Sequence, residues 1–191
     1  MLNTFIKIFS LSLIILLQSC AAAFVTGVAS TTVIATDRRT TGVFVEDENI
    51  EIKVNARLSE NKEIDKKSHI NVVSYNQIVL LVGQTPTQKL KNQAGEIARN
   101  VPSVKTVHNE IRIAAPSNYM TRSSDSYITS KIKTEMTFEK NFSSNAIKVV
   151  TENGEVFLMG LVTKKEAETA IAITKNVDGV QKVIDVFEYV N

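Results

Sequence analysis

Residues 149–163 read VVTENGEVFLMGLVT, and the fold is most readily recognised from this stretch. Two apolar, β-branched runs flank Asn153 and Gly154, a dipeptide that accepts the positive φ angles of a two-residue hairpin turn. We therefore expect two antiparallel strands joined at this turn. Gly160 stands alone in the second run, which indicates a close backbone approach or a bulge and not a phosphate-binding loop.

The same pattern occurs earlier in the chain, so the sequence contains an internal repeat. Residues 70–73 (INVV) match residues 147–150 (IKVV), and residues 79–83 (VLLVG) match residues 156–160 (VFLMG). Both matches have an offset of 77 residues. The offset changes by one residue upstream and downstream, where loops are expected. A repeat of this kind predicts two related structural modules.

Both repeats predict the same order of elements, αββαβ. In the first, Ile50, Val54 and Leu58 recur every four residues, which is typical of a helix with one buried face. The hairpin follows, then a helix whose first turn includes Pro86, and a final strand over residues 104–113.

In the second repeat, Ile128, Ile132 and Met136 form the helical stripe, and Asp125 or Ser124 is the expected N-cap. Each module is therefore expected to be an α+β unit, in which a three-stranded mixed sheet packs against two helices. Its strand–helix–strand crossover should be right-handed. Units this small are marginally stable alone, and packing of one on the other is one way to stabilise them.

The start of the chain is typical of an exported lipoprotein. Lys7 precedes a nearly unbroken apolar run at residues 8–17, which is too short to span a bilayer but suits a signal peptide. Residues 17–20 (LQSC) resemble a bacterial lipobox, which implies lipidation of Cys20 by acyl chains such as palmitate. Ala21, in place of aspartate, is typical of sorting to the outer membrane. The alternative is an ordinary signal peptide with a chance cysteine.

These observations divide the chain into five segments. Residues 1–19 are the expected signal peptide, and residues 20–45, rich in Ser, Thr and Ala, the lipidated tether. Residues 46–113 form the first module and residues 125–191 the second. Between them, residues 114–124 contain a proline and several polar residues, which suits a linker.

Composition and motifs exclude several classes of function. Of the 191 residues, 43% are hydrophobic and 22% charged, which excludes collagen-like, coiled-coil and wholly disordered proteins. The formal net charge of +2 gives no bulk attraction to nucleic acid. One cysteine and two histidines provide neither a disulfide framework nor a metal site, and hydrolase or nucleotide-binding motifs are missing. We therefore expect no catalysis and no cofactor.

The αββαβ repeat, with a glycine near the end of the second strand, resembles the BON domain. Residues 149–163 carry most of this likeness, supported by residues 80–84 (LLVGQ) and 107–112 (VHNEIR). Two such modules behind a lipobox resemble the dual-BON outer-membrane lipoproteins, from Cys20 to Asn191. The resemblance implies a non-enzymatic protein, lipid-anchored on the periplasmic side of the outer membrane. It further implies that the protein supports membrane integrity, gathers at division sites and binds anionic phospholipid through the first helix of its second domain.

In this chain that helix corresponds to residues 125–139. At 100° per residue, Tyr127, Lys131, Thr134 and Phe138 share one face next to the buried stripe, where aromatic and basic side chains suit a membrane interface. A tryptophan stands at the Tyr127 position in a known family member. The residues expected to bind phospholipid are Tyr127, Ile128, Lys131, Lys133, Thr134 and Phe138. The alternative is an ordinary solvated face, with Phe138 packed into the domain.

Two partners therefore remain possible. The first is an anionic phospholipid membrane, attracted by local placement of charge because the second module is not basic overall. The second is a periplasmic protein, such as an envelope assembly factor or a regulator of cell-wall enzymes, with the two modules acting as a docking unit.

Overall fold

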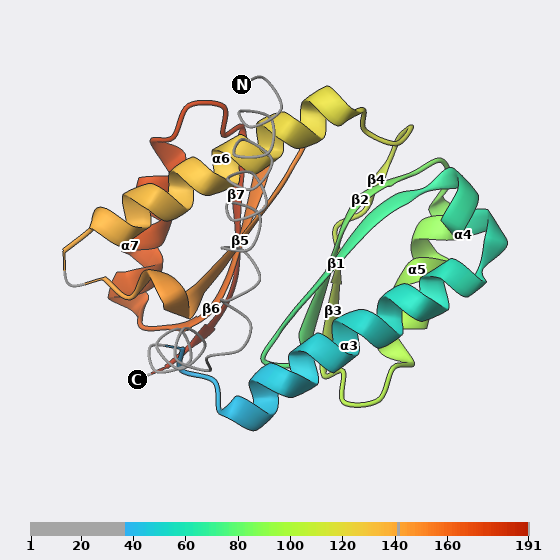
Figure 1. Ribbon diagram of the computed structural model, residues 1–191, viewed down its shortest axis with the longest axis horizontal. Helices are drawn as coiled ribbons and strands as arrows, with labels where there is room; N and C mark the ends of the chain where they lie inside the picture. Colours follow the sequence, from blue (N-terminus) through green and yellow to red (C-terminus); the bar gives the residue numbers. More distant parts are fainter. Residues whose placement is uncertain (1–36, 141, 191) are drawn as a thin grey trace, which may run out of the picture. The chain divides into compact units, whose positions relative to one another are not determined.

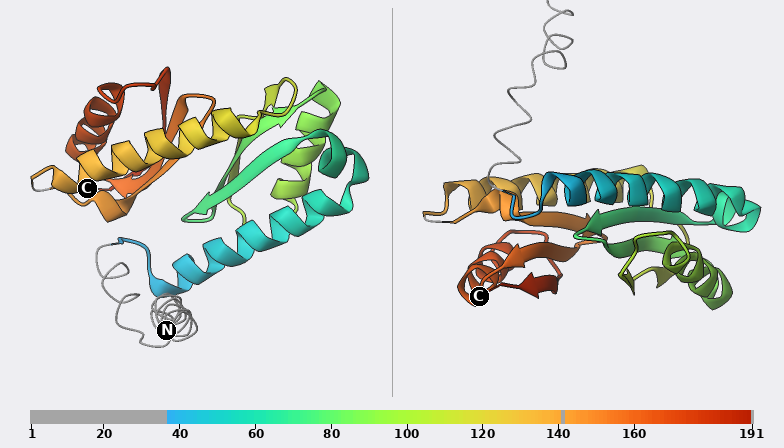
Figure 2. Two further views of the ribbon diagram at one scale, coloured as in Figure 1. Left: turned by 45° about the horizontal axis from the view of Figure 1, so that its top comes forward. Right: turned by 90° about the horizontal axis from the view of Figure 1, so that it is seen from below.

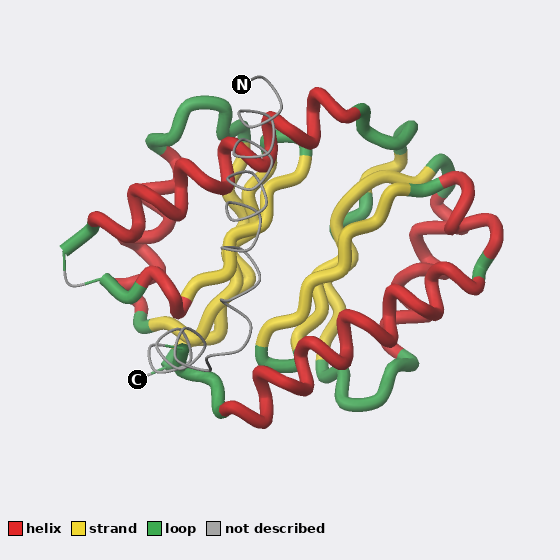
Figure 3. The backbone as a smooth tube through the Cα atoms, in the orientation of Figure 1, coloured by secondary structure: helices red, strands yellow, loops and turns green. Residues whose placement is uncertain are grey.

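The computed structural model describes residues 37–140 and 142–190, which form two αββαβ modules in succession (Figure 1). In each module, helices pack on one face of a single sheet (Figure 3). The structure confirms the predicted α+β class and the predicted order of elements. The proposed signal peptide, Cys20 and most of the tether lie outside the described residues.

Module 1 has a mixed sheet in the order β1-β2-β3, in which β1 pairs antiparallel with β2 and β3 pairs parallel with β2. The strand predicted over residues 104–113 is divided into β3 and a short β4, and β4 also pairs with β2. Ile111, which lies between β3 and β4, is buried in the core. Its elements are α3 (Thr41–Glu60), α4 (Lys62–Lys67), β1 (His69–Tyr75), β2 (Ile78–Thr85), α5 (Gln88–Arg99), β3 (Thr106–Asn109) and β4 (Arg112–Ile113).

Module 2 repeats this topology without the interruption. Its sheet has the order β5-β6-β7, with an antiparallel first pair and a parallel second pair. The long helices α3 and α6 each run along one face of the sheet of their own module (Figure 2). The elements of module 2 are α6 (Tyr119–Phe138), the 3₁₀ turn η2 (Ser144–Ala146), β5 (Ile147–Glu152), β6 (Glu155–Val162), α7 (Lys164–Lys175) and β7 (Lys182–Tyr189).

Both long helices begin earlier than the sequence pattern predicts. Helix α3 begins at Thr41, inside the predicted tether, and α6 begins at Tyr119, inside the predicted linker. Asn118 is the N-cap of α6, so the predicted cap at Asp125 or Ser124 is wrong. The first turns of both helices carry no buried apolar stripe, so apolar periodicity does not reveal them in the sequence.

Each module has its own hydrophobic core between its sheet and its helices. In module 1, Ile50, Val54 and Leu58 of α3 meet Val79 and Leu81 of β2, and the equivalent residues of module 2 do the same. Burial of each aliphatic side chain of this kind contributes about 1.5–3 kcal/mol.

The opposite faces of the two sheets are also apolar, and they pack against each other in a third cluster. Phe157 is its largest fully buried side chain, and the hydroxyl of Tyr75 donates a buried hydrogen bond to the carbonyl oxygen of Ala146 at 3.1 Å. A second buried bond joins Gln84 to Glu152 at 2.6 Å. The buried members of the cluster are Val73, Tyr75, Leu80, Val82, Val150, Phe157, Met159 and Val186.

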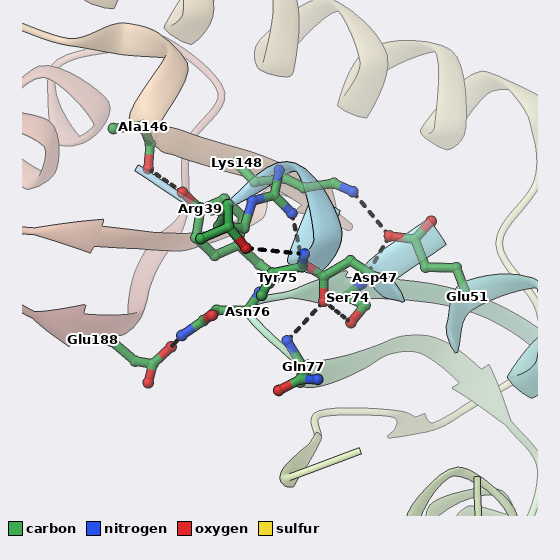
Figure 4. Close-up of polar contacts among 12 residues, drawn as sticks. Arg39, Asp47, Glu51, Ser74, Tyr75, Asn76, Gln77, Ala146, Lys148 and Glu188 are labelled. Carbon is green, nitrogen blue, oxygen red and sulfur yellow. Dashed lines mark hydrogen bonds and ion pairs between the residues drawn. The ribbon is translucent and has the colours of Figure 1, made fainter. Parts of the chain in front are cut away.

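A buried aspartate on α3 holds the hairpin turn of module 1. Asn76 and Gln77 have φ angles of 53° and 68°, which non-glycine residues rarely adopt. The carboxylate of Asp47 accepts hydrogen bonds from both of their backbone N–H groups, at 2.8 and 2.7 Å, and from the hydroxyl of Ser74 (Figure 4). The side chain of Arg39 pairs with the same carboxylate at 2.7 Å, and both side chains are buried.

Module 2 contains the same arrangement at the equivalent positions. Asp125 of α6 accepts hydrogen bonds from the backbone N–H groups of Asn153 and Gly154, at 2.8 and 2.9 Å. Both turn residues have positive φ, as the Asn-Gly dipeptide predicted. Each long helix is therefore fastened to its own hairpin by one buried carboxylate.

The residues just before α3 connect to both modules. Arg38 donates to the carbonyl oxygen of Leu161 and pairs with both carboxylate oxygens of Glu166, at 2.7 and 2.8 Å. Arg39 instead binds Asp47, and its guanidinium lies 4.0 Å from the ring centroid of Tyr75. Both arginines are thus held by the fold.

Removal of the Phe157 ring should destabilise the protein strongly. We expect Phe157→Ala to lower the free energy of unfolding by about 3–5 kcal/mol, because it opens a cavity between the sheets. Urea denaturation followed by circular dichroism would measure this. Phe138→Ala is the matched control: its ring is exposed, and the expected change is within about 0.5 kcal/mol. Equal effects of the two substitutions would contradict the packing described above.

The two buried aspartates should differ in how much they stabilise the fold. Asp125→Asn replaces one carboxylate oxygen by an NH₂ donor and leaves one turn N–H without an acceptor, which should cost about 1–3 kcal/mol. Asp47→Asn also leaves Arg39 buried without its counterion, and should cost about 3–5 kcal/mol. Urea denaturation of both variants would test this order, with the exposed Asp65→Asn as the control. A larger loss for Asp125→Asn than for Asp47→Asn would contradict it.

The Arg38–Glu166 pair makes part of the stability depend on pH. The hydrogen bond from Arg38 is the largest cause that lowers the pKa of Glu166 from 4.5 to about 2. A lowered pKa means that the stabilisation is present above about pH 4.5 and is lost as the pH falls towards 2. Because the pair is partly solvated, we expect about 1 kcal/mol or less. The free energies of unfolding of wild type and Glu166→Gln, measured by urea denaturation at several pH values, should converge as the pH falls from 4.5 to 2. A difference that stays constant across this range would contradict the prediction.

Candidate functional site

Helix α6 presents three distinct faces along its length. One face is buried in the core of module 2 and carries Ile128, Ile132 and Met136, with Asp125 at its start. A second face lines a groove beside β1 and β5. The third face is exposed, and it carries most of the residues that the sequence assigned to phospholipid.

Two aromatic side chains dominate the exposed face. Tyr127 is 67% exposed and Phe138 is 80% exposed. Phe138 is therefore not packed into the domain, which was the alternative reading of this face. Thr134 lies between the two rings along the helix axis, and its hydroxyl donates to the carbonyl oxygen of Ser130.

The exposed face extends further towards the start of α6 than the sequence predicted. Met120 is 82% exposed and lies seven residues before Tyr127, so it falls on the same side of the helix. Tyr119 is exposed next to it, with the guanidinium of Arg122 5.2 Å from its ring centroid. Both residues had been assigned to the linker. Extending the helical period backwards from Tyr127 would have found Met120.

The two lysines of the site have different surroundings. The Lys131 ammonium is 3.1 Å from a carboxylate oxygen of Asp178, and this hydrogen bond is the main cause that raises the pKa of Lys131. Lys131 therefore stays protonated at neutral pH, with Asp178 as a fully exposed partner. Lys133 is exposed on the flank of the helix.

The structure corrects the assignment of Ile128. Its side chain is only 4% exposed and packs in the core of module 2. A Cβ at Gly179 would lie 2.9 Å from the terminal methyl of Ile128, which shows how closely the chain passes over it. Ile128 therefore lies beneath the exposed face and supports the helix from the core side.

A small polar cavity lies beside the exposed face. It has a volume of about 300 Å³, and Met120 forms part of its wall. Its hydrogen-bonding side chains include Thr121, Ser124, Asn153 and Gln181. An apolar strip and a polar cavity thus adjoin each other on one side of module 2.

The described ranges contain neither a cluster of potential metal ligands nor a membrane-spanning helix. Within residues 37–140 and 142–190, three or more potential metal ligands do not gather anywhere. In the same part of the chain, no helix combines the length and apolar character needed to cross a membrane. The proposed lipidation site, Cys20, lies outside these ranges.

Comparison with known proteins places both modules in one family. The BON domain family matches residues 46–115 and 124–191. The chain is 39% identical over 177 residues to the outer membrane lipoprotein DolP of Haemophilus influenzae, covering 93% of this chain and 92% of DolP. It is also 39% identical over 154 residues to the 21 kDa hemolysin of Actinobacillus pleuropneumoniae, covering 81% and 79% of the two chains.

A third relative is more distant in sequence. The osmotically-inducible protein Y of Escherichia coli is 30% identical over 145 residues, covering 74% of this chain and 72% of that protein. Among solved structures, the C-terminal domain of CdsD, a structural protein of the type III secretion system of Chlamydia trachomatis, is 18% identical with a TM-score of 0.30. That match covers 76% of this chain and 67% of the CdsD chain. By its two matched domains and its relatives, the chain belongs to the BON domain family.

Proposed function

We propose that this protein is a non-enzymatic outer-membrane lipoprotein that contacts anionic phospholipid through the exposed face of α6. The similarity to DolP along nearly the whole chain supports the location and the lipid anchor at Cys20. The observation that carries the lipid contact is the pair of strongly exposed aromatic rings, Tyr127 and Phe138, on one side of a single helix. We add Met120 to the contact residues predicted from the sequence and remove Ile128.

The geometry of this face suits a helix that lies in the plane of a membrane surface. Met120 and Phe138 are 18 positions apart on α6, which corresponds to about 27 Å along the helix axis. Tyr127 lies between them, so the apolar side chains form a strip parallel to the axis. A strip of this kind can enter the head-group region along its whole length.

Charged side chains flank the strip where phosphate groups would lie. Lys131 is on the same face, and Lys133 is farther round the helix. Each lysine near an anionic surface contributes about 1 kcal/mol. Lys131 must exchange Asp178 for a lipid phosphate, at little cost because this exposed ion pair is weak.

The lipid anchor and the helix would act together. Burial of the Tyr127 and Phe138 rings contributes about 1.5–3 kcal/mol each, which alone gives only weak binding. An anchor at Cys20 would keep the helix close to a membrane and raise its effective concentration there. The anchor would then supply most of the affinity, while the helix selects lipid composition. Support of membrane integrity, and gathering at division sites, would follow from that selection.

Removal of both rings should abolish most vesicle binding. For the mature chain carrying Cys20→Ser, we expect Tyr127→Ala with Phe138→Ala to lower binding to vesicles of phosphatidylglycerol and phosphatidylethanolamine at least tenfold. Flotation would measure it. Tyr189→Ala is the matched control, because it removes an exposed aromatic ring from β7 instead. Unchanged flotation of the double variant would exclude this face as the membrane contact.

A further inference from the structure

The polar cavity beside the exposed strip of α6 carries a negative charge. Among the described residues, Asp125 alone is charged in its lining, and the adjoining basic residues Arg122 and Lys182 are not part of it. In module 1 the equivalent Asp47 pairs with Arg39, but Asp125 has no ion-pair partner within the described ranges. Its carboxylate accepts hydrogen bonds from neutral backbone N–H groups, which leave its charge in place. The cavity therefore attracts a cation.

The cavity also contains hydrogen-bond acceptors that the protein leaves unused. The side chains of Ser124, Asn153 and Gln181 line it, and none of them makes a hydrogen bond to another described residue. Gly154 and Gly179 contribute only backbone to its wall. An ammonium group has three N–H donors and no acceptor, so it can bind these oxygens while the buried carboxylate attracts it across the remaining distance.

A lysine lies near the edge of this cavity. The Lys131 ammonium is 3.1 Å from a carboxylate oxygen of Asp178, and Asp178 directly precedes Gly179 in the cavity wall. The carboxylates of Asp178 and Glu135 both attract Lys131. A phosphate that takes the place of Asp178 therefore lies near two carboxylates, and a cationic group on the same ligand would offset their repulsion.

The cavity, the lysine and the apolar strip adjoin one another. Met120 belongs both to the cavity wall and to the exposed strip that continues through Tyr127. A matching ligand joins an ammonium to a phosphate, and the phosphate to apolar chains. Phosphatidylethanolamine has its groups in this order. A glycerol head group lacks the cation, a serine head group adds a carboxylate near Asp125, and a choline head group has no N–H donor.

We infer, on the basis of the proposed membrane contact of α6, that the cavity binds the ammonium group of phosphatidylethanolamine. Lys131 then binds the phosphate, and the acyl chains lie along the exposed strip. Lys133, which is farther round the helix, attracts anionic lipids separately. The contact therefore favours a membrane that contains both kinds of lipid.

Replacement of the ethanolamine head group would test the inference. The mature chain carrying Cys20→Ser is floated with vesicles of fixed phosphatidylglycerol content, in which the remaining lipid is either phosphatidylethanolamine or phosphatidylcholine. We expect wild type to bind the ethanolamine vesicles about threefold more tightly. Equal binding to both kinds of vesicle would overturn the inference. The membrane contact itself would still stand if Tyr127→Ala with Phe138→Ala abolished that binding, so the two failures are distinguishable.

Arginine variants would test the charge of the cavity. Ser124→Arg places a cation in its lining, and Ser123→Arg is the matched control, because Ser123 is also exposed but lies outside the lining. Both variants should bind phosphatidylglycerol vesicles at least as well as wild type. Only Ser124→Arg should lose the preference for ethanolamine over choline vesicles. Loss of this preference in both variants, or in neither, would contradict an ammonium site in the cavity.

NMR would locate the head group. The ¹⁵N-labelled chain carrying Cys20→Ser is measured on bicelles that contain phosphatidylglycerol with either phosphatidylethanolamine or phosphatidylcholine. We expect the amide signals of Gly154 and Gly179 to differ between the two bicelles, because both glycines line the cavity. The amide of Gly95, in α5 of module 1, should be unchanged. Identical signals of Gly154 and Gly179 in the two bicelles would place the head group elsewhere and overturn the inference.

Discussion

Both sheets of this protein are apolar on both faces, and the rest of the structure depends on that constraint. In β2, Val79 and Leu81 face the helices of module 1, while Leu80 and Val82 face the other sheet. Helices of the same module cover only one face. The second face can be removed from water only by another apolar surface, and the sheet of the neighbouring module supplies it. The two modules therefore form one packed unit and are not independent domains joined by a linker.

Polar contacts determine how the elements meet once this packing exists. The buried carboxylates of Asp47 and Asp125 each join a long helix to a turn whose N–H groups would otherwise lack partners. Tyr75 joins the sheets near one end of the interface and Gln84 joins them near another. Because these bonds are directional, they select one arrangement from the many that apolar contact alone would allow.

The sequence predicted the fold well because apolar periodicity and the Asn153–Gly154 turn are local signals. The internal repeat supported both signals, because two copies of one sequence pattern are expected to adopt the same topology. The helix starts were missed because residues 41–45 and 119–124 lack a buried stripe. The role of Asp47 and Asp125 was also missed, although each lies three residues before a buried isoleucine and so falls on the core side of its helix. A charged residue at a core position was the available signal.

The candidate site was predictable only in part. Helical projection placed Tyr127 and Phe138 together, and the structure shows both exposed. The same projection placed Ile128 in the core stripe, as the structure finds, although Ile128 was also among the residues expected to bind phospholipid. The groove beside β1 and β5 was beyond prediction, because it forms between residues that only the packing of the two modules brings together.

The interface between the sheets also has an evolutionary consequence. The repeat indicates that a single module was once duplicated, and such a module would have exposed the apolar face that now carries Tyr75, Val82 or Phe157. A lone ancestor of this kind would have been driven to pair with a second copy of itself through that face. Gene fusion would then have converted a symmetric homodimer into one chain. Only afterwards could its two halves diverge, so that one long helix acquired the exposed aromatic residues and the other did not.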